Sequence, residues 1–215
     1  MKIALAQQNY TIGDFKSNKE KIVRCIEQAK SESADLVVFS EQAISGAPAY
    51  DLLNKAPFLE LCEETLEEIA RCCEGISVLV GLPAQCMNKT ISVAALIEDR
   101  KIKRYVGKKT IESRDEMCHI SSSKGCEYIK IRGKKIAVVV GEDIKTEQEY
   151  GEYADLIVNL TRSPYSRGVV EKRYVFYRQL AFMTGKTILY VNSVGGQTDI
   201  VYDGSSAAFN SRGEA

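Results

Sequence analysis

The sequence predicts an α/β domain made of two packed β-sheets with helices on their outer faces. Short apolar runs that read as buried strands alternate with amphipathic helices in the first third of the chain, in the order βαβαβ. The middle changes to a β-hairpin, and the last third returns to strands and one long helix. The 215 residues are 45% hydrophobic, with no repeat or linker, so we expect one domain over residues 1–215.

The first half of the chain carries clear signals for both kinds of element. Ser17 and Glu20 have the spacing of a capping box, which predicts the start of a helix with Ile22, Val23 and Ile26 on its buried face. A loop with Gly46 and Pro48 separates the second strand from the second helix. The predicted strands cover residues 2–8, 35–39 and 76–82, and the second helix covers 58–73.

In the second half, residues 91–98 and 101–106 flank the polar pair Asp99-Arg100 and predict a hairpin. Residues 107–127 lack periodicity, which in a compact domain is typical of a lid or binding loop. The remaining elements are strands over 128–131, 135–140, 156–160, 187–192 and 200–202 and a helix over 169–184.

Composition argues against several classes of protein. Lys+Arg and Asp+Glu balance at 29 each, so no overall basic field favours nucleic acid as a partner. No apolar run approaches the roughly 20 residues of a membrane helix, and the start of the chain lacks a signal peptide, so we expect a cytoplasmic protein with no membrane partner. Seven irregularly spaced cysteines without a CxxC pair favour reduced thiols. The single histidine, His119, makes a metal site or a Ser-His-Asp triad improbable, and we expect no metal.

Functional groups of open α/β sheets gather after the carboxyl ends of strands, and three positions meet that condition. Glu41 follows an apolar strand and has the surroundings of a general base, although it equally fits an N-cap or loop acid. Lys108 closes the hairpin and suits an oxyanion partner, or else a solvated basic edge with Lys109. Gly141-Glu142-Asp143 follows the run 136–140 and reads as an active-site corner or as a turn.

Together these strand ends resemble the nitrilase (carbon-nitrogen hydrolase) superfamily. The segment Phe39-Ser-Glu-Gln-Ala-Ile-Ser-Gly46, followed by Tyr50-Asp-Leu-Leu53, is similar to the first catalytic motif of the glutamine-hydrolysing domains of glutamine-dependent NAD synthetases. Asn159-Leu-Thr-Arg-Ser-Pro-Tyr165 and the run from Tyr190 to Ser205 resemble the same subgroup. The resemblance covers essentially residues 1–214 and implies an αββα sandwich.

The resemblance also implies a Glu-Lys-Cys mechanism of amide hydrolysis. It would make Glu41 the base, Lys108 the oxyanion partner with Lys109 as the substitute, and Glu142 the acid that follows the nucleophile. Ser163 and Tyr165 would lie near the bound amide. The implied substrate is a small carboxamide, glutamine first, and the implied partners are an NAD synthetase ligase domain and further copies of the chain. No cofactor is expected in this domain.

The nucleophile of the family is missing, because Gly141 stands where the family has cysteine. Val93 stands where asparagine is usual, and Glu112–Cys118 replaces a stretch rich in proline and aromatic residues. Cys118 and Cys126 are the nearest substitutes in sequence, but neither ends the nucleophile strand. The family continues beyond the segment that ends here at Ala215, so we expect the domain to be truncated. The sequence therefore predicts little or no ammonia release from glutamine, and as an alternative a non-catalytic binding or oligomerisation module.

Overall fold

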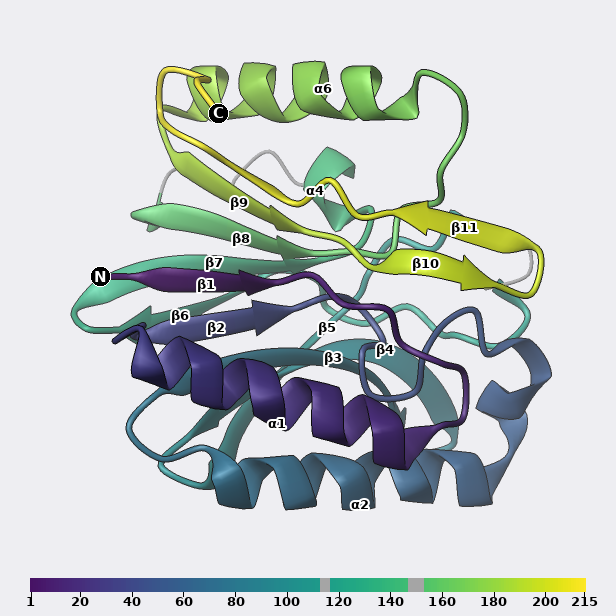
Figure 1. The fold of residues 1–215 in the computed structure, drawn as a ribbon. Helices are drawn as coiled ribbons and strands as arrows, with labels where there is room; N and C mark the ends of the chain where they lie inside the picture. Colours follow the sequence, from purple (N-terminus) through teal and green to yellow (C-terminus); the bar gives the residue numbers. More distant parts are fainter. Residues whose placement is uncertain (113–116, 147–152) are drawn as a thin grey trace.

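Two β-sheets face each other, and helices cover their outer faces in the computed structural model, which describes residues 1–112, 117–146 and 153–215 (Figure 1). Within these residues the first sheet has the order β1-β2-β3-β4-β5 and the second the order β12-β9-β8-β7-β6. The first sheet is formed by β1 (Ile3–Ala6), β2 (Leu36–Phe39), β3 (Ser77–Cys86), β4 (Lys89–Glu98) and β5 (Lys101–Gly107). The second is formed by β6 (Glu127–Ile131), β7 (Lys134–Val140), β8 (Leu156–Leu160), β9 (Thr187–Val191) and β12 (Ala207–Phe209).

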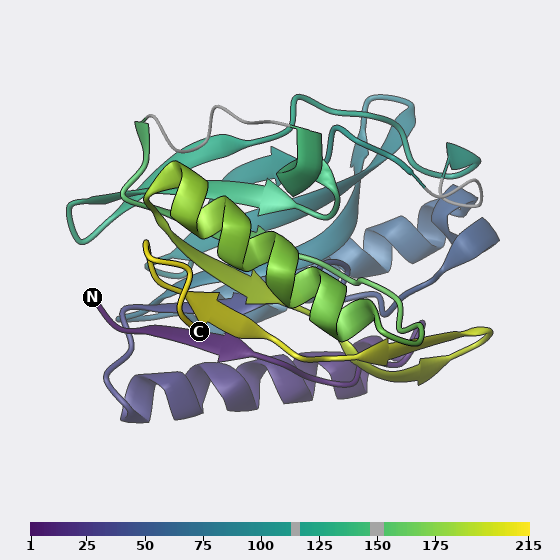
Figure 2. The same ribbon diagram turned by 90° about the horizontal axis from the view of Figure 1, so that it is seen from above.

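The helices lie outside the two sheets, which gives the four layers that the sequence predicts. Figure 1 shows α1 and α2 below the first sheet and α6 above the second, and Figure 2 shows α6 lying across the second sheet from above. The ribbon β10-β11 extends from the end of β9. The remaining bounds are α1 (Phe15–Ser31), η1 (Tyr50–Asn54), α2 (Ala56–Cys72), α4 (Asp143–Thr146), α6 (Val169–Thr184), β10 (Val194–Gln197) and β11 (Ile200–Asp203).

Three apolar layers hold these elements together. Ile22, Ile26 and Leu66 pack between the first sheet and its helices. Between the sheets lies a second layer that includes Val38 and Val138, and a third around Tyr177 lies under α6. β2, β7 and β8 are interior strands of their sheets and face apolar layers on both sides. Their sequences are therefore almost continuously apolar.

The parallel strands place their carboxyl ends at one end of the sandwich. β1 pairs with β2, and β7 with β8 and β8 with β9, all in parallel. Their arrows point the same way in Figure 1. The residues that follow β2, β7 and β8 are therefore neighbours, although they are far apart in the sequence.

Several local predictions differ from the structure. The first helix begins at Phe15, and its N-cap is Asp14, whose carboxylate accepts a hydrogen bond from the backbone N–H of Ser17. The predicted capping box at Ser17 and Glu20 was therefore wrong by one turn, because an aspartate three residues earlier supplies the acceptor. The hairpin at Asp99-Arg100 is confirmed, and both residues have the positive φ of a type I′ turn. Strands β10 and β12 were missed because they are short and rich in glycine or alanine.

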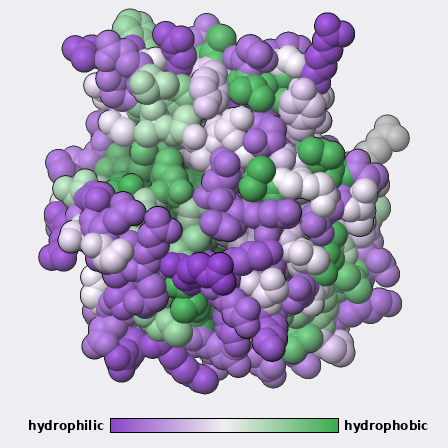
Figure 3. Space-filling view, viewed as in Figure 1, coloured by the Kyte–Doolittle hydropathy of each residue, from purple (hydrophilic) through white to green (hydrophobic). Residues whose placement is uncertain are grey.

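None of the helices in the described residues has the length and apolarity that crossing a bilayer requires. Figure 3 shows hydrophilic residues dominating over the helical layers, with hydrophobic residues gathered between them on one side of the sandwich. None of the seven cysteines forms a disulfide bond. Burial raises the pKa of the Cys62 thiol to about 12, so this thiol stays protonated and unreactive.

Candidate active site

Glu41 lies two residues beyond the end of β2 and is almost completely buried. Its backbone N–H donates to the carbonyl oxygen of Thr161, which follows β8 in the opposite sheet, at 3.3 Å. The loop can approach β3 closely because residue 81 is glycine: a β-carbon there would lie 2.4 Å from the carbonyl oxygen of Ser40. The sequence thus directs a carboxylate into the space between the two sheets.

Lys108 follows β5 and points into the same space. Its backbone N–H donates to the carbonyl oxygen of Ser92 at 2.8 Å, which fixes the start of the segment that leaves the sheet. Its ammonium group lies 3.2 Å from Oε1 of Glu41 and 2.6 Å from Oε2 of Glu142. Lys108 is fully buried whereas Lys109 is exposed, so the structure brings Lys108, and not the substitute, to Glu41.

Gly141 sits at the end of β7, where the chain turns with φ of +58°. A β-carbon at this position would lie 3.1 Å from Oε2 of Glu41 and 2.8 Å from Nζ of Lys108. The residue therefore faces both of the predicted catalytic side chains at van der Waals distance or closer. A strand that ends in a sharp positive-φ turn is also the backbone arrangement that presents nucleophiles in other hydrolases.

The site holds two carboxylates, of Glu41 and Glu142, and two cations, of Lys108 and Arg162, in a small and largely buried volume. Arg162, which follows β8, brings its Nε atom to 3.8 Å from Oε1 of Glu41 and is 12% exposed. Burial raises the pKa of Glu142, but the charge and hydrogen bond of Lys108 and the charge of Arg162 outweigh it and hold that pKa below its usual value. The four side chains thus form a cluster of zero net charge, which is the condition for keeping ions buried.

Two buried residues position the charged groups. The hydroxyl of Ser92 donates to Oε1 of Glu41 at 2.9 Å. The carboxylate of Asp143 accepts from the backbone N–H groups of Lys109 at 2.8 Å and Thr110 at 2.5 Å. Asp143 therefore ties the turn that follows Gly141 to the segment that carries Lys108. The Gly-Glu-Asp corner forms a turn that leads into α4, and it also provides this tie.

A cavity of about 300 Å³ opens beside Gly141, and the lining residues include Glu142, Thr161, Ser163 and Tyr190. Ser163 is held by its backbone N–H, which donates to Oδ1 of Asn192 at 2.8 Å. The structure thus brings Ser163 and Glu142 to one cavity. Tyr165 lies elsewhere: its side chain is about half exposed, and its backbone N–H donates to Val201 of β11.

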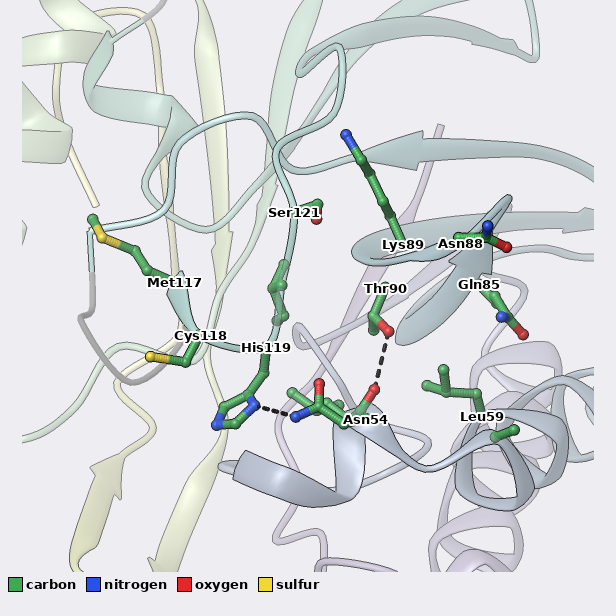
Figure 4. Close-up of a pocket in the computed structure, with 13 residues that line it drawn as sticks. Asn54, Leu59, Gln85, Asn88, Lys89, Thr90, Met117, Cys118, His119 and Ser121 are labelled. Atoms are coloured by element: carbon green, nitrogen blue, oxygen red, sulfur yellow. Dashed lines mark hydrogen bonds between the residues drawn. The ribbon is translucent and has the colours of Figure 1, made fainter.

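Cys118 and His119 line a different cavity, of about 330 Å³, beside η1 and the β3–β4 hairpin (Figure 4). Nδ1 of His119 lies 2.8 Å from the side-chain nitrogen of Asn54. Glu41, Lys108 and Gly141 are not among the described residues that line this cavity. Cys126 packs against the apolar layer around Tyr177. Residues 113–116 of the replaced stretch lie outside the described residues.

The part of the chain that the structure describes contains no group of three or more His, Cys, Asp or Glu side chains that could hold a metal ion. Ser92 and Arg162 are the site residues that sequence reasoning missed. A polar residue in the otherwise apolar strand 91–98 was the available signal for Ser92, whereas a lone arginine in a loop gives none.

The chain is similar to known proteins over almost its whole length. The carbon-nitrogen hydrolase family matches the chain over residues 2–215. Glutamine-dependent NAD(+) synthetases from Synechocystis and Xylella fastidiosa are 34% and 32% identical to it, over 99% of this chain and 43% and 41% of their own lengths. The chain therefore spans about two fifths of the curated relatives it matches.

Solved structures give the same result for the fold. The glutamine-dependent NAD+ synthetase from Acinetobacter baumannii superposes with a TM-score of 0.91 at 28% identity, over 99% of this chain and 42% of that one. An amidase from Nesterenkonia superposes with a TM-score of 0.87 at 20% identity, over 100% of this chain and 84% of that one. The chain belongs to the carbon-nitrogen hydrolase family.

Proposed function

We propose that this chain binds a small carboxamide, glutamine first, in the site at Gly141 and does not hydrolyse it. The observation that carries the proposal is the position of Gly141, which faces Glu41 and Lys108 at the end of β7 but has no side chain to attack with. Covalent amide hydrolysis needs an activated nucleophile within about 3.5 Å of the carbonyl carbon. Glycine supplies none.

The charges of the site favour a neutral ligand. Glu41 and Glu142 already balance Lys108 and Arg162, so a charged ligand head would leave an uncompensated buried ion. A carboxamide offers N–H donors to a carboxylate and a carbonyl oxygen to an ammonium group without changing the net charge. The neighbouring cavity of about 300 Å³ is at the lower end of the range for ligand sites and suits a ligand the size of an amino acid.

The same geometry explains what a nucleophile would do here. A cysteine sulfur at residue 141 would lie within reach of Oε2 of Glu41, which could accept its proton and later return it to the departing ammonia. Lys108 would stabilise the oxyanion of the tetrahedral intermediate. Glu41 and Lys108 already face residue 141 in the native chain, and the lysine tail would shift to admit a β-carbon there.

The test measures ammonia release from glutamine by the native chain, by Gly141→Cys and by Gly141→Cys/Glu41→Gln. We expect no release from the native chain, turnover by the cysteine variant, and loss of at least about a hundredfold in the double variant. Calorimetry should detect saturable binding of glutamine by the native chain, and weaker binding of glutamate. Ammonia release by the native chain, or the absence of any glutamine binding, would overturn the proposal.

The wider setting of the domain is part of the proposal. We propose a partner ligase domain, because the curated relatives extend well beyond the region they share with this chain. A cytoplasmic location is supported by the seven cysteines, none of which forms a disulfide bond. The predicted homo-oligomer has a candidate surface on α6, where Val175, Phe182 and Met183 are 51%, 71% and 80% exposed, and light scattering of the purified chain would test it.

A further inference from the structure

A second groove, of about 650 Å³, lies away from the site, between the free edges of the two sheets. β5 is the last strand of the first sheet and β6 is the last strand of the second. The two edges are linked where Arg104 of β5 contacts Glu127 at 3.1 Å and donates to the carbonyl oxygen of Tyr128 at 3.4 Å. The groove therefore has one strand edge on each side.

The floor of the groove is apolar. Leu96 and Ile129 line it and are 5% and 4% exposed. Tyr128 forms part of the wall, and the ammonium group of Lys135 lies 4.4 Å from the centre of its ring. An apolar floor between two strand edges is suited to alternate side chains of a bound extended chain.

The rim of the groove is basic. Lys103 on one side and Lys130 on the other are exposed, and within the described residues neither has an acidic partner. The one acid among the lining residues, Glu98, accepts a hydrogen bond from the hydroxyl of Ser77 at 2.8 Å. In a chain whose net charge is zero, this concentration of cations is local, and it complements an anionic partner.

We propose that this groove binds an extended acidic segment of a partner protein, which adds as a strand to one of the two free edges. Charge alone would also attract nucleic acid. The strand edges decide between the two. Among the described residues β5 and β6 are each paired with a strand on one side only, and a backbone ladder on the other side can form only with another polypeptide. Lysines on an edge strand also discourage unwanted sheet pairing, but that protective role does not need an apolar floor between the strands.

The test uses fluorescence anisotropy of a labelled peptide of about eight residues in which glutamate and valine alternate, a length that covers either edge. The native chain should bind it saturably, and the affinity should fall as salt rises. Lys103→Glu/Lys130→Glu should weaken binding by about tenfold or more. The matched control, Lys16→Glu/Lys55→Glu, reverses two exposed lysines on α1 and before α2 and should bind within about twofold of the native chain.

A second pair of probes separates strand addition from plain charge attraction. The same peptide with N-methyl groups on alternate residues cannot form the ladder and should bind at least about tenfold more weakly. A single-stranded oligonucleotide of equal charge should compete poorly. Equal binding of the N-methylated peptide, equal competition by the oligonucleotide, or an equal loss in the control variant would overturn the proposal. Circular dichroism of both double variants confirms that each is folded.

Discussion

The tail of Lys108 occupies the space that a side chain at residue 141 would need, since a β-carbon on Gly141 would lie 2.7 Å from Cε of Lys108. The lysine carbon is the far part of a flexible side chain, so it can move. Such a movement has to preserve its contacts with Glu41 and Glu142. The glycine at residue 141 and the position of the lysine tail are thus coupled, because both use the same space.

Replacement of Gly141 by alanine should lower the free energy of unfolding by about 2–3 kcal/mol, from the left-handed backbone and from the overlap with Lys108. Gly133 is the matched control, because it has φ of +78° but open space around its β-carbon position. Gly133→Ala should cost only the backbone strain, about 1 kcal/mol. Urea denaturation of both variants measures the difference, and equal losses would show that Lys108 yields without cost.

Replacement of Lys108 by methionine should lower the free energy of unfolding by about 3–5 kcal/mol at neutral pH. The carboxylates of Glu41 and Glu142 would then have Arg162 as their one remaining cation among the described residues. Lys108 is what holds the pKa of Glu142 below its usual value, so in the variant burial raises that pKa. A raised folded-state pKa means that the variant loses stability as pH rises through that value.

The penalty of Lys108→Met should therefore be smaller at about pH 5 than at about pH 7.5. In the native chain the sign is opposite: the stabilisation from Glu142 is present above its usual pKa and is lost as pH falls through its lowered one. Urea denaturation of both proteins at the two pH values checks this. A penalty that does not change with pH would mean that Glu142 turns to solvent in the variant.

Sequence patterns predict the layers of this fold well, because its central strands are buried on both faces and its helices are amphipathic. β2 and β7 end in apolar runs that are followed by polar residues or glycine. That change in residue type identified Glu41 and the Gly141 corner as strand ends. The pairing of β8 with β7 and with β9, and the packing of the two sheets against each other, follow from contacts between distant residues that no local pattern contains.

The site was less predictable for the same physical reason. The distance from Lys108 to Glu142 depends on the tie between Asp143 and the backbone of Lys109, and that tie joins segments more than thirty residues apart. Arg162 reaches Glu41 because the loop after β8 contacts the loop after β2 in the other sheet, and the sequence of neither loop encodes that contact. Local polarity marked the strand ends, but the partners of each charge became visible only in the folded chain.

The pair Arg173 and Asp203 should stabilise the wall of the cavity beside Gly141. Two hydrogen bonds of 2.9 and 3.0 Å join them, and both side chains are largely buried. Arg173→Met should lower the free energy of unfolding by about 3–5 kcal/mol, because Asp203 is left charged and buried. Arg173→Met/Asp203→Asn should recover most of that loss, and thermal denaturation of the single and double variants measures the recovery.

Asp143 should affect turnover through the position of Lys108 once a nucleophile is present. In the Gly141→Cys background, Asp143→Ala removes the acceptor of two backbone N–H groups and should reduce kcat for ammonia release by at least about tenfold, with a smaller effect on KM. Asp143→Asn keeps one acceptor oxygen and should retain more of the activity. A purely structural role would instead lower the stability of both variants without separating kcat from KM, so denaturation of each variant accompanies the kinetics. If Asp143→Ala matches the parent in kcat, the tie to Lys109 and Thr110 does not position the lysine.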